Sequence, residues 1–177
     1  NWLIQINTNE FKTQYISSTR KPISPYIKSK LLGYENTPNA KFVALKKSYA
    51  GDKVSFNSVY SINSFGNRVS IAPETKTINS VLFLGGSLTF GTGLDDASTL
   101  PSLFSALTEI NSINAGVSGY GIHQAYTILK NKDIYKRKSE NRKVSVIVYR
   151  MLTNHINRAG GHVSWDPNGP CYKLNTS

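Results

Sequence analysis

The chain alternates apolar and polar residues in its first half and carries continuous apolar runs in its second half. Within residues 53–62, apolar side chains recur at nearly every second position, a period typical of a half-buried β-strand. Residues 63–67 contain a glycine and turn-forming asparagines, after which apolar residues resume at Val69 and Ile71. This pattern predicts a β-hairpin.

Residues 1–50 show no sustained period of either kind. Pro22, Pro25 and Pro38 interrupt any helix in this stretch, and basic and aromatic residues are scattered along it. We therefore expect irregular, extended chain that wraps around another part of the molecule. Together, residues 1–79 are predicted to form an N-terminal extended and β-containing segment that packs on the main domain.

The pattern changes after Pro73, where continuous apolar runs alternate with stretches of helical spacing. Strands are predicted at 81–84, 112–114 and 144–149, and helices at 100–110 and 122–129. This alternating order of strands and helices predicts right-handed crossovers and a parallel sheet covered on both faces. Residues 80–177 are therefore expected to form an α/β domain with three α/β/α layers, of flavodoxin-like kind.

The composition is that of a globular chain. The 177 residues include 39% apolar types and a single cysteine, Cys171. A chain of this length can bury a sizeable core, and one cysteine can form neither an internal disulfide nor a cysteine-rich zinc site. No apolar run approaches the roughly 20 residues that a membrane-spanning helix needs, so no transmembrane segment is predicted.

The net charge of +11 is unevenly distributed along the chain. Residues 1–79 carry 11 basic and 4 acidic side chains, residues 80–130 carry 1 and 3, and residues 131–177 carry 9 and 3. The densest basic run, 130–143, lies between two apolar segments and contains acidic residues, so we expect a solvated connection there. The sequence therefore predicts no nucleic-acid partner.

The chemistry of a parallel sheet is expected at the carboxyl ends of its strands. The loop after the first strand, 85–93, is rich in glycine. It lacks the lysine of a Walker phosphate loop, the third glycine of a dinucleotide fingerprint and the final glycine of an α/β-hydrolase elbow. What remains is Ser87 at a strand end between small residues. Two interpretations are open, a serine nucleophile and a helix-capping residue.

The other two strand-end loops favour the nucleophile. The loop 114–121 contains Gly119, whose backbone N–H can point over the sheet edge, and the loop after the third strand offers the side-chain amide of Asn154. With the N–H of Ser87, these groups are three candidate donors to one oxygen atom. Such donors stabilise the charge that develops on a carbonyl oxygen during acyl transfer.

These blocks resemble those of the SGNH hydrolases, also called the GDSL esterase and lipase family. Residues 85–88 (GGSL) are similar to the family's G-D-S-[LF] block, residues 114–119 to its second block, and Asn154 with His155 to its third. Residues 60–69 and the phrase FLGGSLTFGTG also resemble large bacterial SGNH-like proteins. The likeness covers about residues 54–158. It implies an SGNH-type fold in which Ser87 is the nucleophile and Ser87, Gly119 and Asn154 form the oxyanion hole.

The chain departs from the family pattern at two points. Gly86 stands where the family has aspartate, and none of the histidines His123, His155 and His162 follows an aspartate by three positions. The D-x-x-H block that supplies the family's general base is therefore absent, and a serine without a base is a weak nucleophile. Either the base lies beyond Ser177, or a local histidine replaces it, or the site does not catalyse. We expect the first, with an incomplete domain, because three parallel strands leave an edge unpaired; His155 and His162 are the secondary candidates.

If the site is active, the resemblance implies that the chain is an esterase that hydrolyses an acyl ester of a small molecule or a glycan, with no metal or organic cofactor. Two alternatives stay open. One is an O-acetyltransferase that passes the acyl group to a glycan, and the other is an SGNH-like binding module without turnover. Likeness to exported bacterial esterases favours an extracytoplasmic location.

Two further residues are interpreted as structural. Cys171 has no flanking motif that would support a reactive thiolate. Asp166 has no histidine partner in the sequence pattern, and residues 165–169 are predicted to form a turn.

Overall fold

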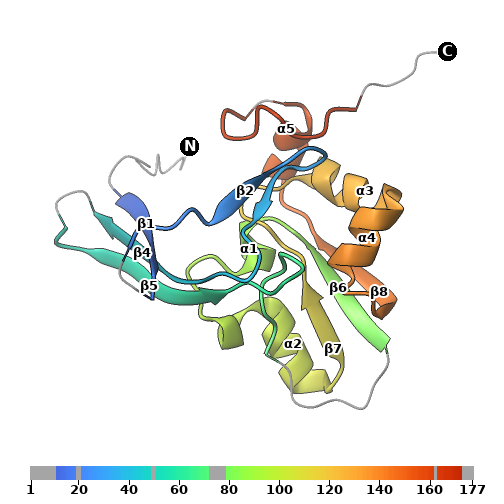
Figure 1. Cartoon of the computed structure of the whole chain (residues 1–177), viewed down its shortest axis with the longest axis horizontal. Coiled ribbons are helices and arrows are strands. Elements are labelled where there is room, and N and C mark those ends of the chain that lie inside the picture. Colours follow the sequence, from blue (N-terminus) through green and yellow to red (C-terminus); the bar gives the residue numbers. More distant parts are fainter. Residues whose placement is uncertain (1–10, 19–20, 49–50, 72–78, 162, 173–177) are drawn as a thin grey trace, which may run out of the picture.

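The computed structural model describes residues 11–18, 21–48, 51–71, 79–161 and 163–172, which form a mixed α/β structure (Figure 1). The strands are β1 (Phe11–Ser17), β2 (Tyr26–Ser29), β3 (Gly33–Asn36), β4 (Lys41–Ser48), β5 (Val54–Ser61), β6 (Asn79–Gly85), β7 (Asn111–Asn114) and β8 (Lys143–Arg150). The helices are α1 (Ser87–Phe90), the 3-10 turn η2 (Asp96–Ser98), α2 (Leu100–Thr108), α3 (Ile122–Lys130), α4 (Lys132–Lys138) and α5 (Asn154–Ala159).

The parallel sheet has the strand order β7-β6-β8. Both neighbours run parallel to β6, which lies in the centre and is buried along almost its whole length. Helix α2 connects β6 to β7, and α3 and α4 connect β7 to β8. The predicted α/β class and the predicted parallel sheet are confirmed, and each predicted strand and helix of this half lies within two residues of its expected bounds.

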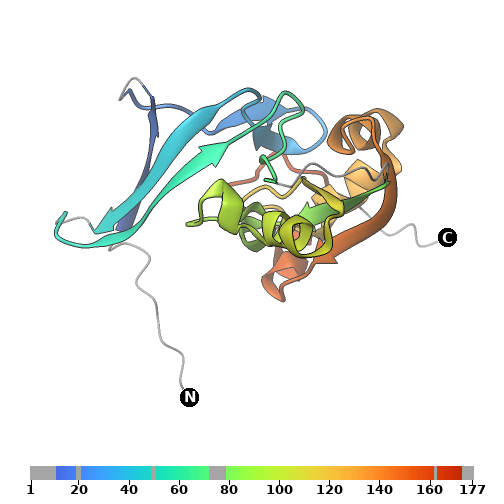
Figure 2. The ribbon, with the colours of Figure 1, turned by 90° about the horizontal axis from the view of Figure 1, so that it is seen from below.

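The first half of the chain is more regular than the sequence predicts. Strands β1, β4 and β5 form an antiparallel sheet, and β2 pairs with β3 in a short hairpin. Figures 1 and 2 show the three-stranded sheet to one side of the parallel sheet. The prediction of irregular chain was wrong for these strands. Strand β1 pairs with the distant β4, whereas β2 and β3 have 4 residues each, which is too short to show a sustained period.

The predicted hairpin at 53–71 has a different partner. The turn at 63–67 is present, with the Gly66 N–H donating to the Asn63 carbonyl, and a single antiparallel bridge joins Ile62 to Arg68. Strand β5, however, pairs along its length with β4. The alternating pattern identified the strand correctly, but such a pattern carries no information on which other strand it pairs with.

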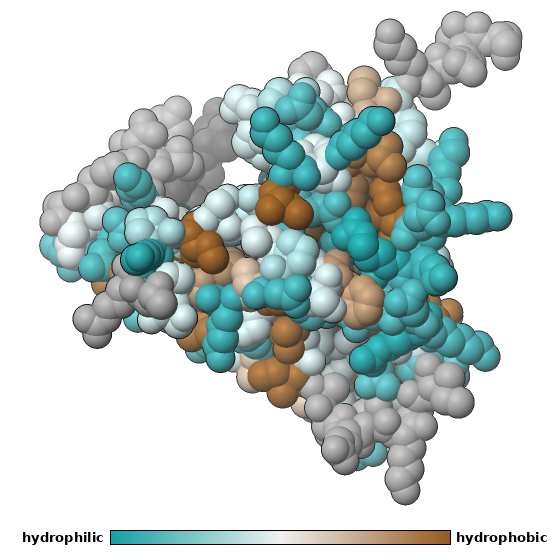
Figure 3. Space-filling model, viewed as in Figure 1, coloured by the Kyte–Doolittle hydropathy of each residue, from teal (hydrophilic) through white to brown (hydrophobic). Residues whose placement is uncertain are grey.

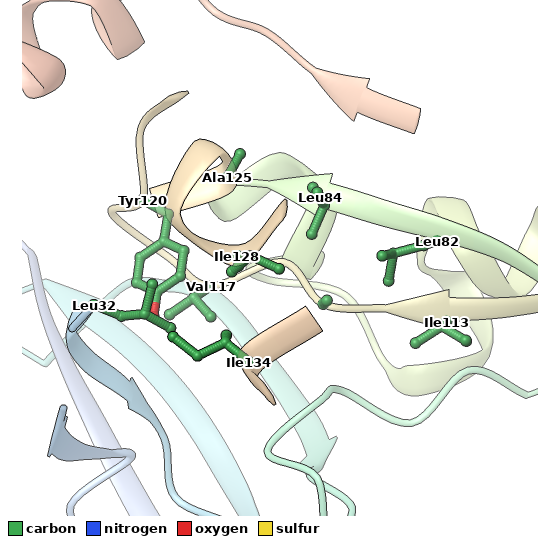
Figure 4. Close-up of a cluster of buried hydrophobic side chains, with 10 residues drawn as sticks. Leu32, Leu82, Leu84, Ile113, Val117, Tyr120, Ala125, Ile128 and Ile134 are labelled. Carbon is green, nitrogen blue, oxygen red and sulfur yellow. The ribbon is translucent and has the colours of Figure 1, made fainter. Parts of the chain in front are cut away.

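The main core lies on the α3 and α4 side of the parallel sheet (Figure 4). Leu82 and Leu84 of β6 pack there against Ile128 of α3 and Ile134 of α4. Leu32, from the turn between β2 and β3, is fully buried in the same cluster, so the N-terminal segment supplies part of this core. On the opposite face, Phe83 meets Phe104 of α2 edge to face at 5.4 Å.

Strand β8 is not the buried strand that its continuous apolar run predicts. Val146 is 52% exposed and Ile147 is 42% exposed. The strand lies at an edge of the sheet, and among the described residues no further strand pairs with its outer side. The expected cover on both faces therefore holds for β6 but was wrong for β8, because an apolar run alone cannot distinguish a central strand from an edge strand.

The basic run 130–143 connects α3 to β8 and is solvated over much of its length, as predicted. Five of its basic residues are exposed, namely Lys130, Lys132, Lys136, Arg142 and Lys143. The prediction missed helix α4 within the run, and it was wrong for Lys138 at the end of that helix, which is fully buried.

On the face shown in Figure 3, hydrophobic side chains reach the surface as separate patches among hydrophilic ones. No helix in the described part of the chain combines the length and the apolar character needed to cross a membrane.

Candidate functional site

The three predicted site residues follow three neighbouring strands at their carboxyl ends. Ser87 is the first residue of α1, directly after β6; Gly119 lies between β7 and α3; and Asn154 is the first residue of α5, after β8. Because β6 is central and parallel to both neighbours, the three loops meet at one edge of the sheet.

The first two loops pack closely on one another. The N–H of Val117 donates to the carbonyl of Gly85, 3.1 Å away. A Cβ on Gly116 would lie 2.6 Å from the backbone nitrogen of Phe90, so a larger residue would force helix α1 away from the second loop. The glycine at this position thus allows the loop that carries Ser87 and the loop that carries Gly119 to touch.

The backbone N–H groups of Ser87 and Gly119 are available as donors. Neither donates to a protein acceptor in the hydrogen-bond network of the described residues. Gly119 has a φ of +92°, which L-residues rarely adopt, and a Cβ there would overlap the hydroxyl group of Tyr34. Only glycine therefore fits this position.

Asn154 lies at the same edge, but its side chain is exposed to solvent. No hydrogen bond among the described residues joins it to Ser87 or to Gly119. Helix α5 contacts the first loop through the opposite face, which carries His155 and Arg158, both buried. The structure therefore brings together the loops of Ser87 and Gly119 and leaves the amide of Asn154 without a partner from either.

Side chains from α5 fill the space beside Gly86. A Cβ on Gly86 would lie 3.1 Å from Nε2 of His155, from Nη1 of Arg158 and from the carbonyl oxygen of Tyr120. Nη1 of Arg158 also donates to that carbonyl, at 2.7 Å. Glycine at position 86 thus leaves room for two bulky side chains, which link the first loop, the second loop and α5.

The hydrogen bonds of His155 define its tautomer. The N–H of Leu152 can only donate, and it points at Nδ1 of His155 at 3.4 Å; the hydroxyl group of Tyr149 is 2.7 Å from the same atom. Nδ1 is therefore an acceptor, and the ring proton of the neutral imidazole is on Nε2. Nε2 faces Gly86 without a partner among the described residues. In this state His155 is a donor and does not fit the role of general base.

His123 belongs to a second buried group. Its Nε2 lies 3.8 Å from Oδ2 of Asp166, and the same oxygen accepts from the amide of Gln124 at 2.5 Å. No sequence pattern pairs Asp166 with His123, which is 43 positions away; the tertiary structure brings the two side chains together, because the turn 165–169 is hydrogen-bonded to α3 through Gln124. Burial raises the pKa of Asp166, and the Gln124 hydrogen bond offsets part of that effect. His162, which together with His155 is a secondary candidate for the general base, lies outside the described residues.

We expect protein stability to fall as the pH is lowered through the histidine range. Burial, and then the charge of Arg158, lowers the pKa of both His123 and His155 below the ordinary 6.5. Below pH 6.5 the unfolded chain binds protons that the folded chain does not, so each ring reduces stability by at most about 1.4 kcal/mol per pH unit. Urea denaturation between about pH 7 and pH 5 measures this slope. If stability depends on pH equally steeply in the His123→Gln/His155→Gln double variant, these two histidines are not its cause.

Two hollows flank these loops. The leucine hollow, about 250 Å³ in volume, is lined by Ser87 and by leucine side chains of the α1–α2 region, namely Leu88, Leu94, Leu100 and Leu103. The aromatic hollow, about 460 Å³, is lined by Gly119 together with Tyr26, Tyr34 and Trp165. Between them, the hydroxyl groups of Thr92 and Ser118 are hydrogen-bonded at 2.7 Å; Thr92 lines the first hollow and Ser118 lines the second.

Sequence reasoning missed the side chains that shape this edge from distant segments. Arg158 holds the Tyr120 carbonyl, and Trp165 lies over its guanidinium group at 5.7 Å. The hydroxyl of Tyr34 donates to the Ser118 carbonyl. No local motif marks these residues, since each contact spans elements that are far apart in the chain. Cys171 is free and exposed.

Comparison with models of known protein families and with curated proteins finds no match for the chain.

Proposed function

We propose that the chain is an SGNH-type serine ester hydrolase of three α/β/α layers, with Ser87 as nucleophile. The observation that carries the proposal is the pair of unpartnered N–H groups, on Ser87 and Gly119, in two loops that touch at the carboxyl edge of the sheet beside a hollow. Free backbone donors at such an edge are suited to an oxyanion. The exposed amide of Asn154 completes the donor set when it turns toward the bound ester.

In this proposal the Ser87 oxygen attacks the carbonyl carbon of the ester, and the carbonyl oxygen becomes an oxyanion held by the N–H groups of Ser87 and Gly119. The bond to the alcohol oxygen then breaks, and the alcohol leaves with the proton that Ser87 has lost. A water molecule attacks the acyl-serine, the carboxylic acid departs and Ser87 regains a proton. No metal or organic cofactor takes part in these steps.

The general base is expected from outside the described residues. His155 presents a protonated Nε2 to the first loop, and His123 faces Asp166 rather than the first loop. We therefore retain a base beyond residue 177 as part of the proposal, with His162, which lies outside the described residues, as the secondary candidate. The lack of a suitably placed base among the described residues also favours one alternative, a non-catalytic SGNH-like module that binds an ester without turnover.

A fluorophosphonate probe tests the nucleophile on the full-length protein. We expect labelling at the peptide that contains Ser87, and hydrolysis of p-nitrophenyl acetate that falls by about a thousandfold or more in Ser87→Ala. Ser64→Ala is the control, because Ser64 is exposed in the turn 63–67, lines neither hollow and should keep both activities.

Labelling that persists in Ser87→Ala would exclude this serine as the nucleophile. Absence of both labelling and hydrolysis in the parent protein would overturn the hydrolase and favour the binding module. Transfer of acetyl groups to an added sugar at the expense of hydrolysis would identify an O-acetyltransferase instead.

A further inference from the structure

We propose that the aromatic hollow binds an uncharged saccharide ring, which is the alcohol part of the ester, while the acyl group occupies the leucine hollow. This inference rests on the proposed function, because it divides one substrate between the two sides of the Ser87 and Gly119 loops. The aromatic hollow has a volume of about 460 Å³, within the range of about 300–1,000 Å³ that is usual for small-molecule sites.

The walls of the aromatic hollow suit a sugar. Tyr26 and Tyr34 come from the β2–β3 hairpin and pack edge to face at 5.2 Å, and Trp165 contributes an indole ring that is 54% exposed. The face of an aromatic ring is electron-rich and attracts weakly positive C–H groups, of which one face of a pyranose is made. Asn168 and Ser118 add polar atoms for the hydroxyl groups at the rim of the sugar.

The aromatic walls are held rigidly. The hydroxyl of Tyr34 donates to the carbonyl of Ser118, and the hydroxyl of Tyr120 donates to the carbonyl of Tyr34. Asp166, fixed by Gln124, anchors the turn that carries Trp165. Two segments more than a hundred residues apart therefore form a preformed site, which reduces the entropy cost of binding.

The charge of the hollow selects an uncharged ligand. Although the chain has a net charge of +11, no lysine or arginine is among the described residues that line this hollow, and its one ionisable acidic side chain is Asp166. Arg158, whose guanidinium group is 5.7 Å from the Trp165 ring centroid, is buried and donates to the Tyr120 carbonyl, and it is not among the lining residues. A phosphate or carboxylate would find no cation in the lining of the hollow, which disfavours nucleotides and acidic sugars.

The position of the hollow assigns it to the alcohol side of the ester. Gly119 lines it, Ser87 lines the leucine hollow, and the Thr92 to Ser118 hydrogen bond separates the two. An ester bridging this boundary places its carbonyl at the donor groups. The smaller volume of the leucine hollow, about 250 Å³, favours a short acyl chain.

Saturation-transfer NMR with methyl 6-O-acetyl-glucoside tests the site in the Ser87→Ala protein, in which the ester survives. We expect transfer to the ring protons and a dissociation constant that rises about tenfold, equivalent to about 1.4 kcal/mol, in Ser87→Ala/Trp165→Ala. Tyr172→Ala in the same background is the control, since this exposed ring lines a different hollow and should leave binding unchanged. Equal binding after loss of Trp165, or tighter binding of glucose 6-phosphate, would overturn the proposal.

The catalytic readout separates this inference from the proposed function. With Ser87 intact, Trp165→Ala should raise KM for methyl 6-O-acetyl-glucoside about tenfold. KM for ethyl acetate should stay unchanged, because its alcohol is too small to fill the hollow. If Trp165→Ala changes the hydrolysis of both esters equally, or changes neither, the saccharide site is excluded and the proposed hydrolase stands. If the sugar ester binds but no serine is labelled, the hydrolase is excluded and the saccharide site stands.

Discussion

Replacing Arg68 with alanine is expected to lower the free energy of unfolding by about 3–5 kcal/mol, because it removes the fully buried partner of a largely buried ion pair. Arg68 is 1% exposed and lies 3.0 Å from Asp96. All five of its N–H groups have acceptors, which are Asp96 and the carbonyls of Val59, Phe90, Gly91 and Leu94. The guanidinium group also lies 4.1 Å from the Tyr60 ring centroid and 4.8 Å from that of Phe90.

These contacts join the antiparallel sheet to the loop that follows α1. Val59 and Tyr60 belong to β5, whereas Phe90 and Gly91 end the helix that begins at Ser87. Burial lowers the pKa of Arg68, and Asp96 opposes this effect, so the group stays charged at neutral pH. Without Arg68, four carbonyls and a carboxylate each lose one donor. The first loop then keeps fewer contacts with β5, chiefly the hydrogen bond from the Gly93 N–H to the Tyr60 hydroxyl.

Urea denaturation of Arg68→Ala measures the loss, with Arg142→Ala as the control. Arg142 is exposed and 3.6 Å from Glu140, a kind of pair that contributes about 0–1 kcal/mol. Arg68→Lys keeps the charge but offers three donors instead of five, and it serves as the comparison if the alanine variant does not accumulate. Equal midpoints for Arg68→Lys and Arg142→Ala would show that the network does not stabilise the fold.

Lys138→Ala is expected to destabilise the protein by about 3 kcal/mol, because it removes a buried cation from a buried acid. Nζ of Lys138 lies 3.1 Å from Oε2 of Glu35 and donates to the Gly66 carbonyl at 3.3 Å. Burial lowers the pKa of Lys138, and Glu35 opposes that effect. Burial alone would raise the pKa of Glu35, but Arg137 and Lys138 outweigh it, and the pKa is lowered.

The size of this effect reflects what the pair connects. Glu35 is in β3, Gly66 is in the turn before Arg68, and Lys138 ends α4, so its ammonium group bridges three segments. Arg137 shares this role, since its Nη1 is 2.7 Å from the same Glu35 oxygen. A double-mutant cycle with Glu35→Gln isolates the pairwise energy. Lys136→Ala, on the exposed side of the same helix, should change stability by less than about 0.5 kcal/mol. An equal effect of Lys136→Ala and Lys138→Ala would contradict the expectation.

Periodicity was sufficient to locate most elements of the second half. Helix α3 was predicted within one residue because its apolar positions recur with helical spacing. Strand β6 was predicted within two residues because its continuous apolar run is followed by glycines. The first half was predicted less well. Strand β1 pairs with β4, which lies about 30 residues further along the chain, and pairing over such a distance leaves no trace in the local pattern.

The candidate site, too, was predicted only in part from the sequence. The order of strands and helices implied that the loops of Ser87, Gly119 and Asn154 would meet, since parallel strands end at one edge. It did not imply that Arg158 and His155 would occupy the space beside Gly86. That packing depends on the angle at which α5 crosses the first loop, which no sequence period encodes.

The sequence by itself therefore determined the α/β class, the order of the elements and the strand-end position of Ser87, because these depend on local periodicity and on the handedness of the chain. Only the tertiary structure decided that β8 is an exposed edge, that Lys138 is a buried cation and that Tyr34 and Trp165 share one hollow with Gly119. The physical reason is that burial and pairing arise from contacts between residues far apart in the chain.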